Sequence, residues 1–301
     1  MNRLWGYLSA LTVALLFGVW FSLDKTLLGY LHPFALAALT YIIASIFLFS
    51  INFSPFKDKI LNIINQKNQV EDFISRKEYM ILFSTAIFGS VMAPALYLSG
   101  LSRITAVNAA LLANVEILFI IIIGIFFLKE KVGRKDILGF AFLLIGAVFL
   151  STNNLQNLSL NQNLFGSLLV ISAAFFWSLD TSLSKFLSHK KNIIFITALK
   201  TAIGGSILFI LSLILKLNFA LPLFRLPLLL FIGIVCVSFS LVLVYYSLRI
   251  IGSTRTGSIF ALSSLFGAVT AFIALCEPLT ILQLIFGFLM LIGVLILYKE
   301  K

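Results

Sequence analysis

Residues 107–128, VNAALLANVEILFIIIIGIFFL, form an almost uninterrupted apolar run. A helix of about 20 residues, rising 1.5 Å per residue, crosses a hydrocarbon core of roughly 30 Å. Similar runs recur from Leu4 to Tyr298 in a chain of 301 residues that is 61% hydrophobic and 11% charged. A soluble domain is nearer about 45–50% apolar and 25% charged. The composition therefore indicates an all-α integral membrane protein.

Breaks at charged, Pro and Asn-rich positions divide the chain into ten expected transmembrane helices. These are residues 4–23, 34–53, 79–101, 107–128, 137–150, 164–187, 193–215, 226–251, 256–275 and 279–298. Pro94 is expected to kink the third span, at little cost if a neighbouring helix satisfies the freed carbonyl group. The polar linker 52–78 is either an amphipathic surface helix or a solvated connection.

The basic residues predict the orientation of these helices, because short loops rich in Lys and Arg stay cytoplasmic. With the amino terminus inside, 17 of the 22 Lys and Arg residues lie in cytoplasmic segments, four lie outside and Lys200 lies in a span. We expect a multi-pass protein of the plasma (cell inner) membrane with both termini cytoplasmic. The net charge of +11 then needs no nucleic-acid partner.

The chain also repeats itself. Phe17, Ser22 and Lys25 recur 160 residues later as Trp177, Ser182 and Lys185, and FLKE at 127–130 recurs 147 residues later as ALCE at 274–277. One repeat holds five helices, so the second repeat is expected to be inverted in the membrane. Inverted repeats are typical of secondary transporters, which bind substrate near the midplane. The expected domains are residues 1–152, including the linker 52–78, and residues 153–301.

The fourth and ninth spans carry a family resemblance. AVNAALLANVEILFIIIIGIFFLKE at 106–130, followed by Gly139 and Gly146, resembles the end of an EamA-like domain of the drug/metabolite transporter superfamily. GSTRTGSIFALSSLFGAVTAFIALCEPLT at 252–280 repeats it. The resemblance covers essentially the whole chain as two tandem EamA domains, with Ile117 and Ser264 at positions where the family often has Pro. It implies ten helices and cytoplasmic termini, but relatives resemble exporters of amino acids and other metabolites and, more distantly, sugar-nucleotide and triose-phosphate exchangers, so no substrate follows.

Glu116 is the sharpest candidate for a functional side chain. It lies nine residues into its span, about 13.5 Å deep and close to the midplane. A charge there costs at least about 2.5–3.5 kcal/mol, and Asn108 shares its helix face. We expect Glu116 and Asn108 to contact substrate or, for Glu116, a proton. The structural alternative is a protonated carboxyl group hydrogen-bonded between helices.

Other polar residues in the spans give further candidates. Asp180 and Lys200 lie at similar depth on consecutive helices, which predicts an ion pair, with gating or substrate contact as the alternative. Arg255 either lines the inner vestibule or anchors to phosphates. Asp24 and Lys25 end the first span on the external side, where snorkelling explains them.

Aromatic and acidic residues at the helix ends complete the set of candidates. The aromatic side chains with polar atoms suited to a binding cavity are Trp20, Tyr97, Trp177, Tyr245 and Tyr246, with packing or an interface belt as the alternative. Glu130 and Glu277 close helices at equivalent repeat positions and are expected to be structural.

These observations favour a secondary transporter that moves a small metabolite, an amino acid or a similar polar or amphipathic solute, by export and alternating access. No GxxxxGK[ST] loop is present, so protons or an exchanged solute are the expected driver. The alternative is a membrane-embedded enzyme acting on a lipid-soluble substrate, but the distant His32 and His189 do not supply a catalytic cluster. Cys236 and Cys276 lie in apolar segments, so no metal, cofactor or catalytic residue is expected.

Overall fold

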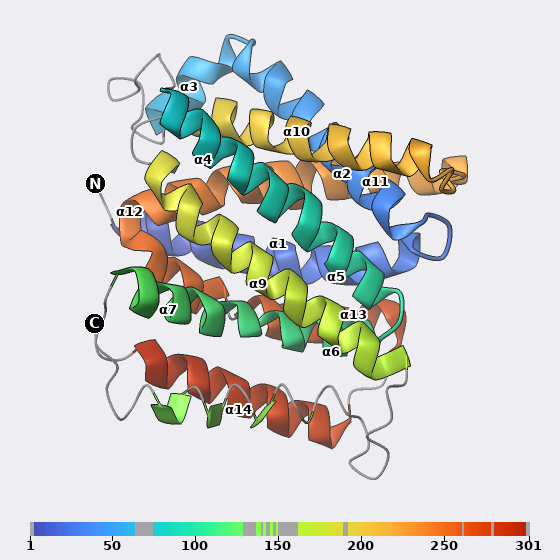
Figure 1. Cartoon of the computed structure of the whole chain (residues 1–301), viewed down its shortest axis with the longest axis vertical. Helices are drawn as coiled ribbons and strands as arrows, with labels where there is room; N and C mark the ends of the chain where they lie inside the picture. The colour runs from blue at the N-terminus through green and yellow to red at the C-terminus, as the bar shows by residue number, and fades with distance from the viewer. Residues whose placement is uncertain are drawn as a thin grey trace.

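The computed structural model describes residues 3–63, 75–128, 162–188, 192–260, 262–277 and 280–298, and eight residues between 137 and 149. The first part contains α1 (Arg3–Leu27), α2 (Pro33–Asn52), α3 (Phe56–Ile63), α4 (Arg76–Ala86), the π-helical η1 (Ile87–Met92), α5 (Ala93–Leu101), α6 (Ala106–Ala113) and α7 (Val115–Leu128). The second contains α9 (Gln162–Ser188), α10 (Ile193–Ile214), the short η2 (Leu223–Arg225), α11 (Leu226–Phe231), the π-helical η3 (Ile232–Phe239), α12 (Ser240–Phe260), α13 (Leu262–Leu275) and α14 (Ile281–Tyr298). The long helices run back and forth between the two ends of one bundle (Figure 1).

Six helical segments in the described part of the chain are long and apolar enough to cross a membrane. They are Leu4–Leu27, Pro33–Asn52, Arg76–Leu101, Leu164–Leu187, Ile193–Ile214 and Leu223–Ile251, and shorter apolar helices follow at Ala106–Ile120, Leu262–Leu275 and Ile281–Gly293. Each overlaps one expected span. Of the expected fifth span, 137–150, the structure describes eight residues, and all eight are helical. Its described Phe149 stacks on Phe286 of α14, with ring centroids 4.3 Å apart.

The expected break between the eighth and ninth spans appears as a bend within α12. The hydroxyl groups of Ser247 and Thr256 are hydrogen-bonded at 2.8 Å. Nine residues of straight helix would separate them by about 13.5 Å. The chain therefore turns back between these two residues, where the sequence predicts a connection at 252–255.

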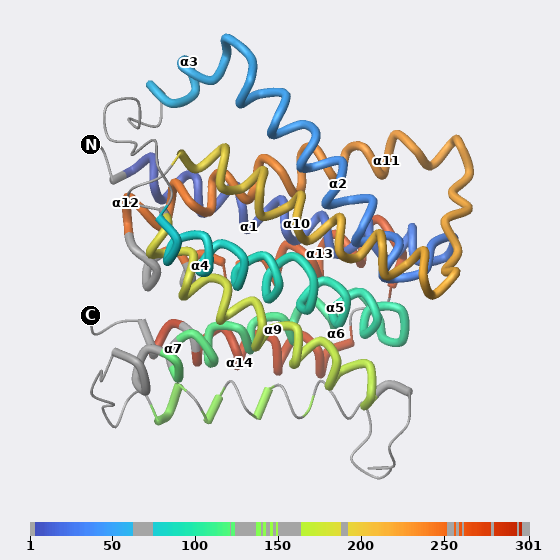
Figure 2. The backbone as a smooth tube through the Cα atoms, turned by 45° about the horizontal axis from the view of Figure 1, so that its top comes forward, coloured from blue at the N-terminus to red at the C-terminus, as the bar shows by residue number. Residues whose placement is uncertain are grey.

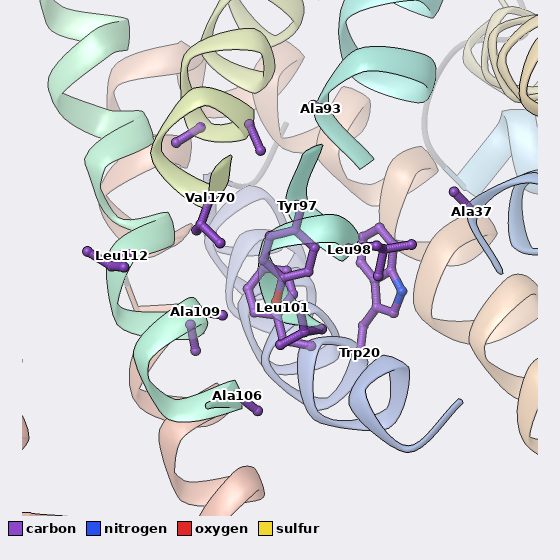
Figure 3. Close-up of a cluster of buried hydrophobic side chains, with 14 of the residues drawn as sticks. Trp20, Ala37, Ala93, Tyr97, Leu98, Leu101, Ala106, Ala109, Leu112 and Val170 are labelled. Atoms are coloured by element: carbon purple, nitrogen blue, oxygen red, sulfur yellow. The ribbon is translucent and has the colours of Figure 1, made fainter. Parts of the chain in front are cut away.

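Helices from the two parts of the chain pack reciprocally. α1 lies against α12 and α13, whereas α9 lies against α4 to α7, and α2 packs along α10. Figure 2 shows this interleaving from a second direction. Gly18 of α1 and Gly267 of α13 allow a close approach, because a Cβ atom on Gly18 would lie 2.6 Å from the Gly267 nitrogen. The core is shared between the two parts rather than divided into two (Figure 3).

The kink expected at Pro94 takes the form of the wide turn η1, which ends one residue before α5 begins. Proline has no N–H group to donate to a carbonyl group in the preceding turn. The carbonyl oxygen of Gly89, five residues before Pro94, accepts a hydrogen bond from the Tyr41 hydroxyl of α2 at 3.3 Å. A neighbouring helix thus satisfies the carbonyl group that the proline leaves free.

One end of the bundle, which we call the outer end, contains the α5–α6 connection and Glu277. The Glu277 carboxylate accepts hydrogen bonds from the backbone N–H groups of Ala106 (3.0 Å) and Val107 (3.1 Å), at the start of α6. Lys25 Nζ donates to the carbonyl groups of Leu101 and Ile104, both at 2.5 Å. Glu277 therefore links the two parts of the chain at this end, and Lys25 links α1 to the α5–α6 connection.

Candidate functional site

A cavity of about 80 Å³ lies at the centre of the bundle. On the same scale one water molecule needs about 10–15 Å³, so the cavity has room for several waters or part of a small solute. Its walls come from both parts of the chain. They are formed by Phe17, Trp20, Phe21, Tyr41, Gly89, Ala113, Asn114, Glu116, Ile117, Ile120, Trp177, Asp180, Thr181, Ser184, Lys200, Leu241, Val244, Tyr245, Leu248, Phe260 and Ser263.

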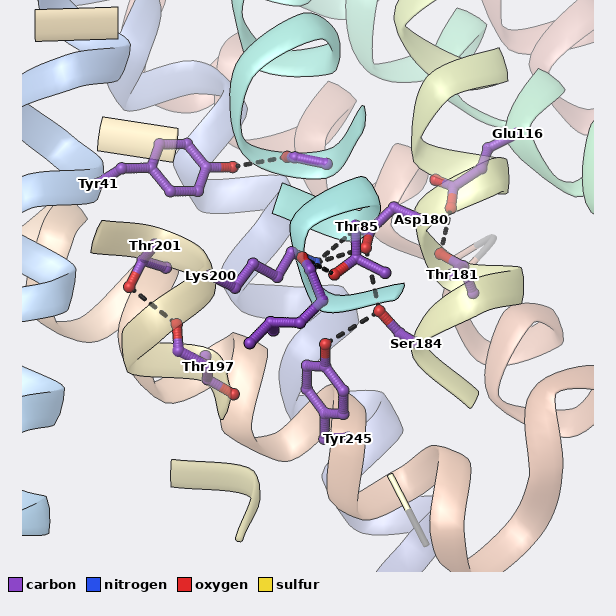
Figure 4. Close-up of polar contacts among 12 residues, drawn as sticks. Tyr41, Thr85, Glu116, Asp180, Thr181, Ser184, Thr197, Lys200, Thr201 and Tyr245 are labelled. Carbon is purple, nitrogen blue, oxygen red and sulfur yellow. Dashed lines mark hydrogen bonds and ion pairs between the residues drawn. The ribbon is translucent and has the colours of Figure 1, made fainter. Parts of the chain in front are cut away.

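An ion pair between α9 and α10 forms one wall (Figure 4). Lys200 Nζ lies 2.6 Å from Asp180 Oδ1 and 2.5 Å from Oδ2, and the Lys200 side chain is 2% exposed. The Ser184 hydroxyl donates to Asp180 Oδ1 at 3.0 Å and shares a second hydrogen bond with the Tyr245 hydroxyl, also at 3.0 Å. Every charged atom of this cluster therefore has a partner, which is the condition for keeping charge away from water.

Glu116 enters the cavity from a break in the predicted fourth span. α6 ends at Ala113 and α7 begins at Val115, so Glu116 lies in the first turn of α7. Asn114 occupies the break and donates to the Ser264 hydroxyl at 2.7 Å. The start of a helix carries partial positive charge, which favours a carboxylate there. The Thr181 hydroxyl donates to Glu116 Oε1 at 3.1 Å.

Aromatic rings of α1 and α9 also line the cavity. The rings of Phe17 and Trp20 lie 5.6 Å apart, and those of Phe21 and Trp177 lie 6.4 Å apart. An aromatic face attracts a cation or stacks on a flat apolar group. The cavity therefore combines aromatic rings with the charged groups of α7, α9 and α10.

The structure brings only some of the predicted site residues to this cavity. Glu116, Trp20, Trp177, Asp180 and Lys200 border it. Asn108 is buried away from it, where it accepts a hydrogen bond from Gln283 Nε2 at 2.7 Å. Tyr97 is also buried, and its ring packs 5.2 Å from that of Trp177 without lining the cavity. Arg255 lies in α12, but its side chain lies outside the described residues, as does Glu130.

Two further residues, Tyr246 and Asp24, differ from the sequence-based expectation. Both Tyr245 and Tyr246 pack in a hydrophobic cluster with Leu187 and Ile194, but of the two only Tyr245 borders the cavity. Adjacent helical residues point about 100° apart, so only one of the two tyrosines can face inward. Asp24 is not a snorkelling residue, because it is only 1% exposed.

Sequence reasoning missed Asn114, Thr181 and Ser184. Asn114 has a detectable signal, since Asn is a poor helix former and stands in the middle of an apolar run. Thr181 and Ser184 have none on their own, because small hydroxyl residues are common in transmembrane helices. They become recognisable only from their spacing to Asp180.

The charges around the cavity do not cancel. The single cation, among the described lining residues, is Lys200, and Asp180 pairs with it. Glu116 is the second acid, and its described hydrogen-bond partner is the uncharged hydroxyl of Thr181. The cavity therefore has one acidic group in excess, which suits a proton or the cationic group of a solute.

Comparison with known proteins gives one consistent result. A sequence model of the EamA-like transporter family matches residues 4–152 and again residues 164–299. A protein of Methanothermobacter thermautotrophicus named as an uncharacterized transporter is 48% identical over 299 residues, which cover 99% of this chain and 87% of that protein. The uncharacterized transporter YyaM of Bacillus subtilis is 25% identical over 311 residues, covering 98% and 94%.

A solved structure shares the fold. A crystal structure with 16% sequence identity superposes with a TM-score of 0.70, over 98% of this chain and 96% of the other. The family description and both relatives' names are those of transporters rather than enzymes.

Proposed function

The chain belongs to the EamA-like transporter family, and on this premise we propose that it is a secondary transporter that exports a small amphipathic metabolite by alternating access. The observation that carries the proposal is a cavity lined by aromatic rings together with Glu116 and the Asp180–Lys200 pair. Substrate sites in such transporters lie near the midplane between two repeats.

The chemistry of the walls selects a class of substrate. The excess acid at Glu116 suits an amine or another cationic group, and Trp20 and Trp177 suit an apolar or aromatic body. Lys200 keeps its charge beside Asp180 and offers a partner for a carboxylate when the pair rearranges. An amino acid or a related amine carries these groups together, so this class is the proposed substrate.

The proposed mechanism uses two halves, residues 1–152 and 153–301, as inverted five-helix repeats within a ten-helix bundle. The reciprocal packing of α1 and α9 supports this division, because the first helix of each half lies against the third and fourth helices of the other. Both termini are proposed to be cytoplasmic in the plasma membrane, as the distribution of Lys and Arg indicates. Reporter fusions at either terminus test this orientation.

Glu116 is proposed to carry the proton or the cationic group of the substrate. Glu116→Gln preserves the shape of the side chain and its acceptor for Thr181, but removes its ionisation. In proteoliposomes with an imposed pH gradient, labelled amino acids and amines should accumulate with the unmodified protein. The Glu116→Gln variant should lose pH-driven accumulation and retain exchange of substrate across the membrane.

Asp58→Asn is the matched control, because Asp58 is an exposed carboxylate on α3, remote from the cavity lining. It should transport like the unmodified protein. Equal pH-driven accumulation by the Glu116→Gln variant would exclude the proton role of Glu116. Absence of both accumulation and counterflow for every amine and amino acid tested with the unmodified protein would contradict the proposed substrate class.

A further inference from the structure

A third acid, Asp24, is buried outside the central cavity. Asp24 lies in the last turns of α1, near the outer end, and is 1% exposed. It does not line the cavity that contains Glu116. The proposed transport mechanism gives it no role.

Neither carboxylate oxygen of Asp24 has a hydrogen-bond partner within the described part of the chain. The indole N–H group of Trp20, one turn earlier, is directed toward it without completing a hydrogen bond. Lys25 is adjacent in sequence, but its Nζ donates to the carbonyl groups of Leu101 and Ile104. This neighbouring cation is thus bound to other groups.

The groups that face Asp24 from the packed elements are uncharged. Tyr41 of α2, Tyr97 of α5 and Cys236 of η3 are each close enough to feel its charge. The Tyr97 hydroxyl also has no described partner, so it is available to a neighbouring group. Two other acids act on the same tyrosines, Asp180 on Tyr41 and Glu277 on Tyr97. No described neighbour therefore compensates an ionised Asp24.

An ionised carboxylate that is shielded from water and has no cation or donor is strongly unfavourable, whereas a neutral carboxyl group is tolerated. We propose that Asp24 is a proton-binding site, separate from Glu116, that holds its proton while the outer end is closed. This inference rests on the proposed transport function only for its role in the cycle. The site itself rests on the buried, unpartnered carboxyl group.

The surroundings couple this site to the outer end. Lys25 follows Asp24 directly and holds the carbonyl groups at the end of α5, while Glu277 holds the start of α6. Opening this end would admit water to Asp24. The Oδ–H bond then breaks, the proton leaves as hydronium in the external water, and the carboxylate is hydrated. Closing the end reverses these steps, because the carboxyl group must take up a proton before water is excluded.

The test is infrared difference spectroscopy on the full-length protein in proteoliposomes, at neutral pH in potassium salt. The carbonyl stretch of a protonated carboxyl group is separate from carboxylate bands. We expect this band in the unmodified protein, its loss in Asp24→Asn, and its retention in Asp58→Asn. Selective ¹³C labelling of Asp carboxyl groups in the unmodified protein should shift the same band, which provides the answer without a variant.

Two results would overturn the proposal. One is a protonated-carboxyl spectrum that neither Asp24→Asn nor the ¹³C label changes. The other is a band that disappears when sodium replaces potassium, because Asp24 would then hold a metal cation and not a proton. Neither measurement depends on transport, so a failed substrate screen leaves this result intact, and a missing band leaves the transport proposal intact.

Discussion

Two polar clusters occupy corresponding positions in the two parts of the chain. At the spacing of 160 residues, Trp20, Asp24 and Thr40 correspond to Asp180, Ser184 and Lys200, and at 148 residues Tyr97 corresponds to Tyr245. Packing agrees with these spacings. Ser90 lies against Gly204, and its counterpart Ser238 donates a hydrogen bond to Ala44, the counterpart of Gly204.

The two clusters differ in how their polar groups are satisfied. In the second part, Asp180, Ser184, Lys200 and Tyr245 form a connected network. In the first part, the buried polar atoms of Trp20, Asp24, Thr40 and Tyr97 lack hydrogen-bond partners among the described residues. The comparison teaches that a repeated scaffold does not repeat its chemistry. The second part contains the Asp180–Lys200 ion pair, and the first part contains the Asp24 carboxyl group, whose charge depends on its surroundings.

Breaking the ion pair should have the largest effect on stability. Lys200→Met leaves a buried carboxylate without its cation, and Asp180→Asn leaves a buried ammonium group without its anion. Each change should cost about 3–5 kcal/mol. The double variant should lose much less than the sum, as measured by unfolding in detergent. By contrast, Asp24→Asn should cost less than about 1 kcal/mol, because it removes no pair. The proposed difference between the clusters would be contradicted by additive losses of stability for the Asp180 and Lys200 variants, or by an equally large loss of stability for Asp24→Asn.

Weakening the outer end should have an intermediate effect. Glu277→Gln replaces a carboxylate that accepts two backbone hydrogen bonds with an amide that offers one acceptor oxygen. The loss should be about 1–2 kcal/mol, since hydrogen bonds to charged groups are the stronger ones. Hydrogen exchange at the Ala106 and Val107 amides should accelerate by about tenfold. Cys276→Ser, at an exposed neighbouring residue, is the control, and unchanged exchange in Glu277→Gln would show that the cap does not hold α6.

The smallest effect concerns the residues that cap the second helix of each half. Asn192 accepts hydrogen bonds from two amides at the start of α10, whereas the corresponding His32 accepts one from Phe34 through Nδ1 at 3.3 Å. Burial, followed by the nearby charge of Arg103, lowers the pKa of His32 below its usual 6.5. The neutral, capping form is thus favoured in the folded state, so its stabilisation is present above pH 6.5 and is lost as pH falls through the lowered pKa.

His32→Asn gives both halves the same cap. Thermal unfolding in detergent should show a gain of about 0.5 kcal/mol or less at acidic pH, and almost none at pH 8. A gain that does not depend on pH would mean that the His32 ring does not act through its protonation state.

The helical fold can be predicted from the sequence, because each apolar run is about as long as a helix that crosses the hydrocarbon core of a bilayer. The contact between Asp180 and Lys200 can also be predicted from the sequence, since equal depth on consecutive helices leaves each residue few other partners. Breaks within spans are harder to predict. Asn114 interrupts a run in which every neighbouring residue favours a helix, and its partner Ser264 lies 150 residues away.

The position of Asn108 could not be predicted from the sequence for a related reason. Its helix face matches that of Glu116 in a continuous helix, but the break at Asn114 separates the two. Gln283 of α14 then takes up the Asn108 side chain. Asp24 was missed because position near a helix end suggests exposure, and only the packing of α2, α5 and η3 around it shows its burial.

The wide turns η1 and η3 precede Tyr97 and Tyr245 in their respective spans. A π-helical turn accommodates extra chain relative to an α-helix, so it shifts the register of everything that follows. One residue of shift corresponds to a rotation of about 100°. A helical wheel drawn through either span is therefore out of phase beyond the wide turn. This shift in register determines which tyrosine faces inward. A single helical period applied to the whole span cannot reproduce the shift, so sequence alone does not distinguish Tyr245 from Tyr246.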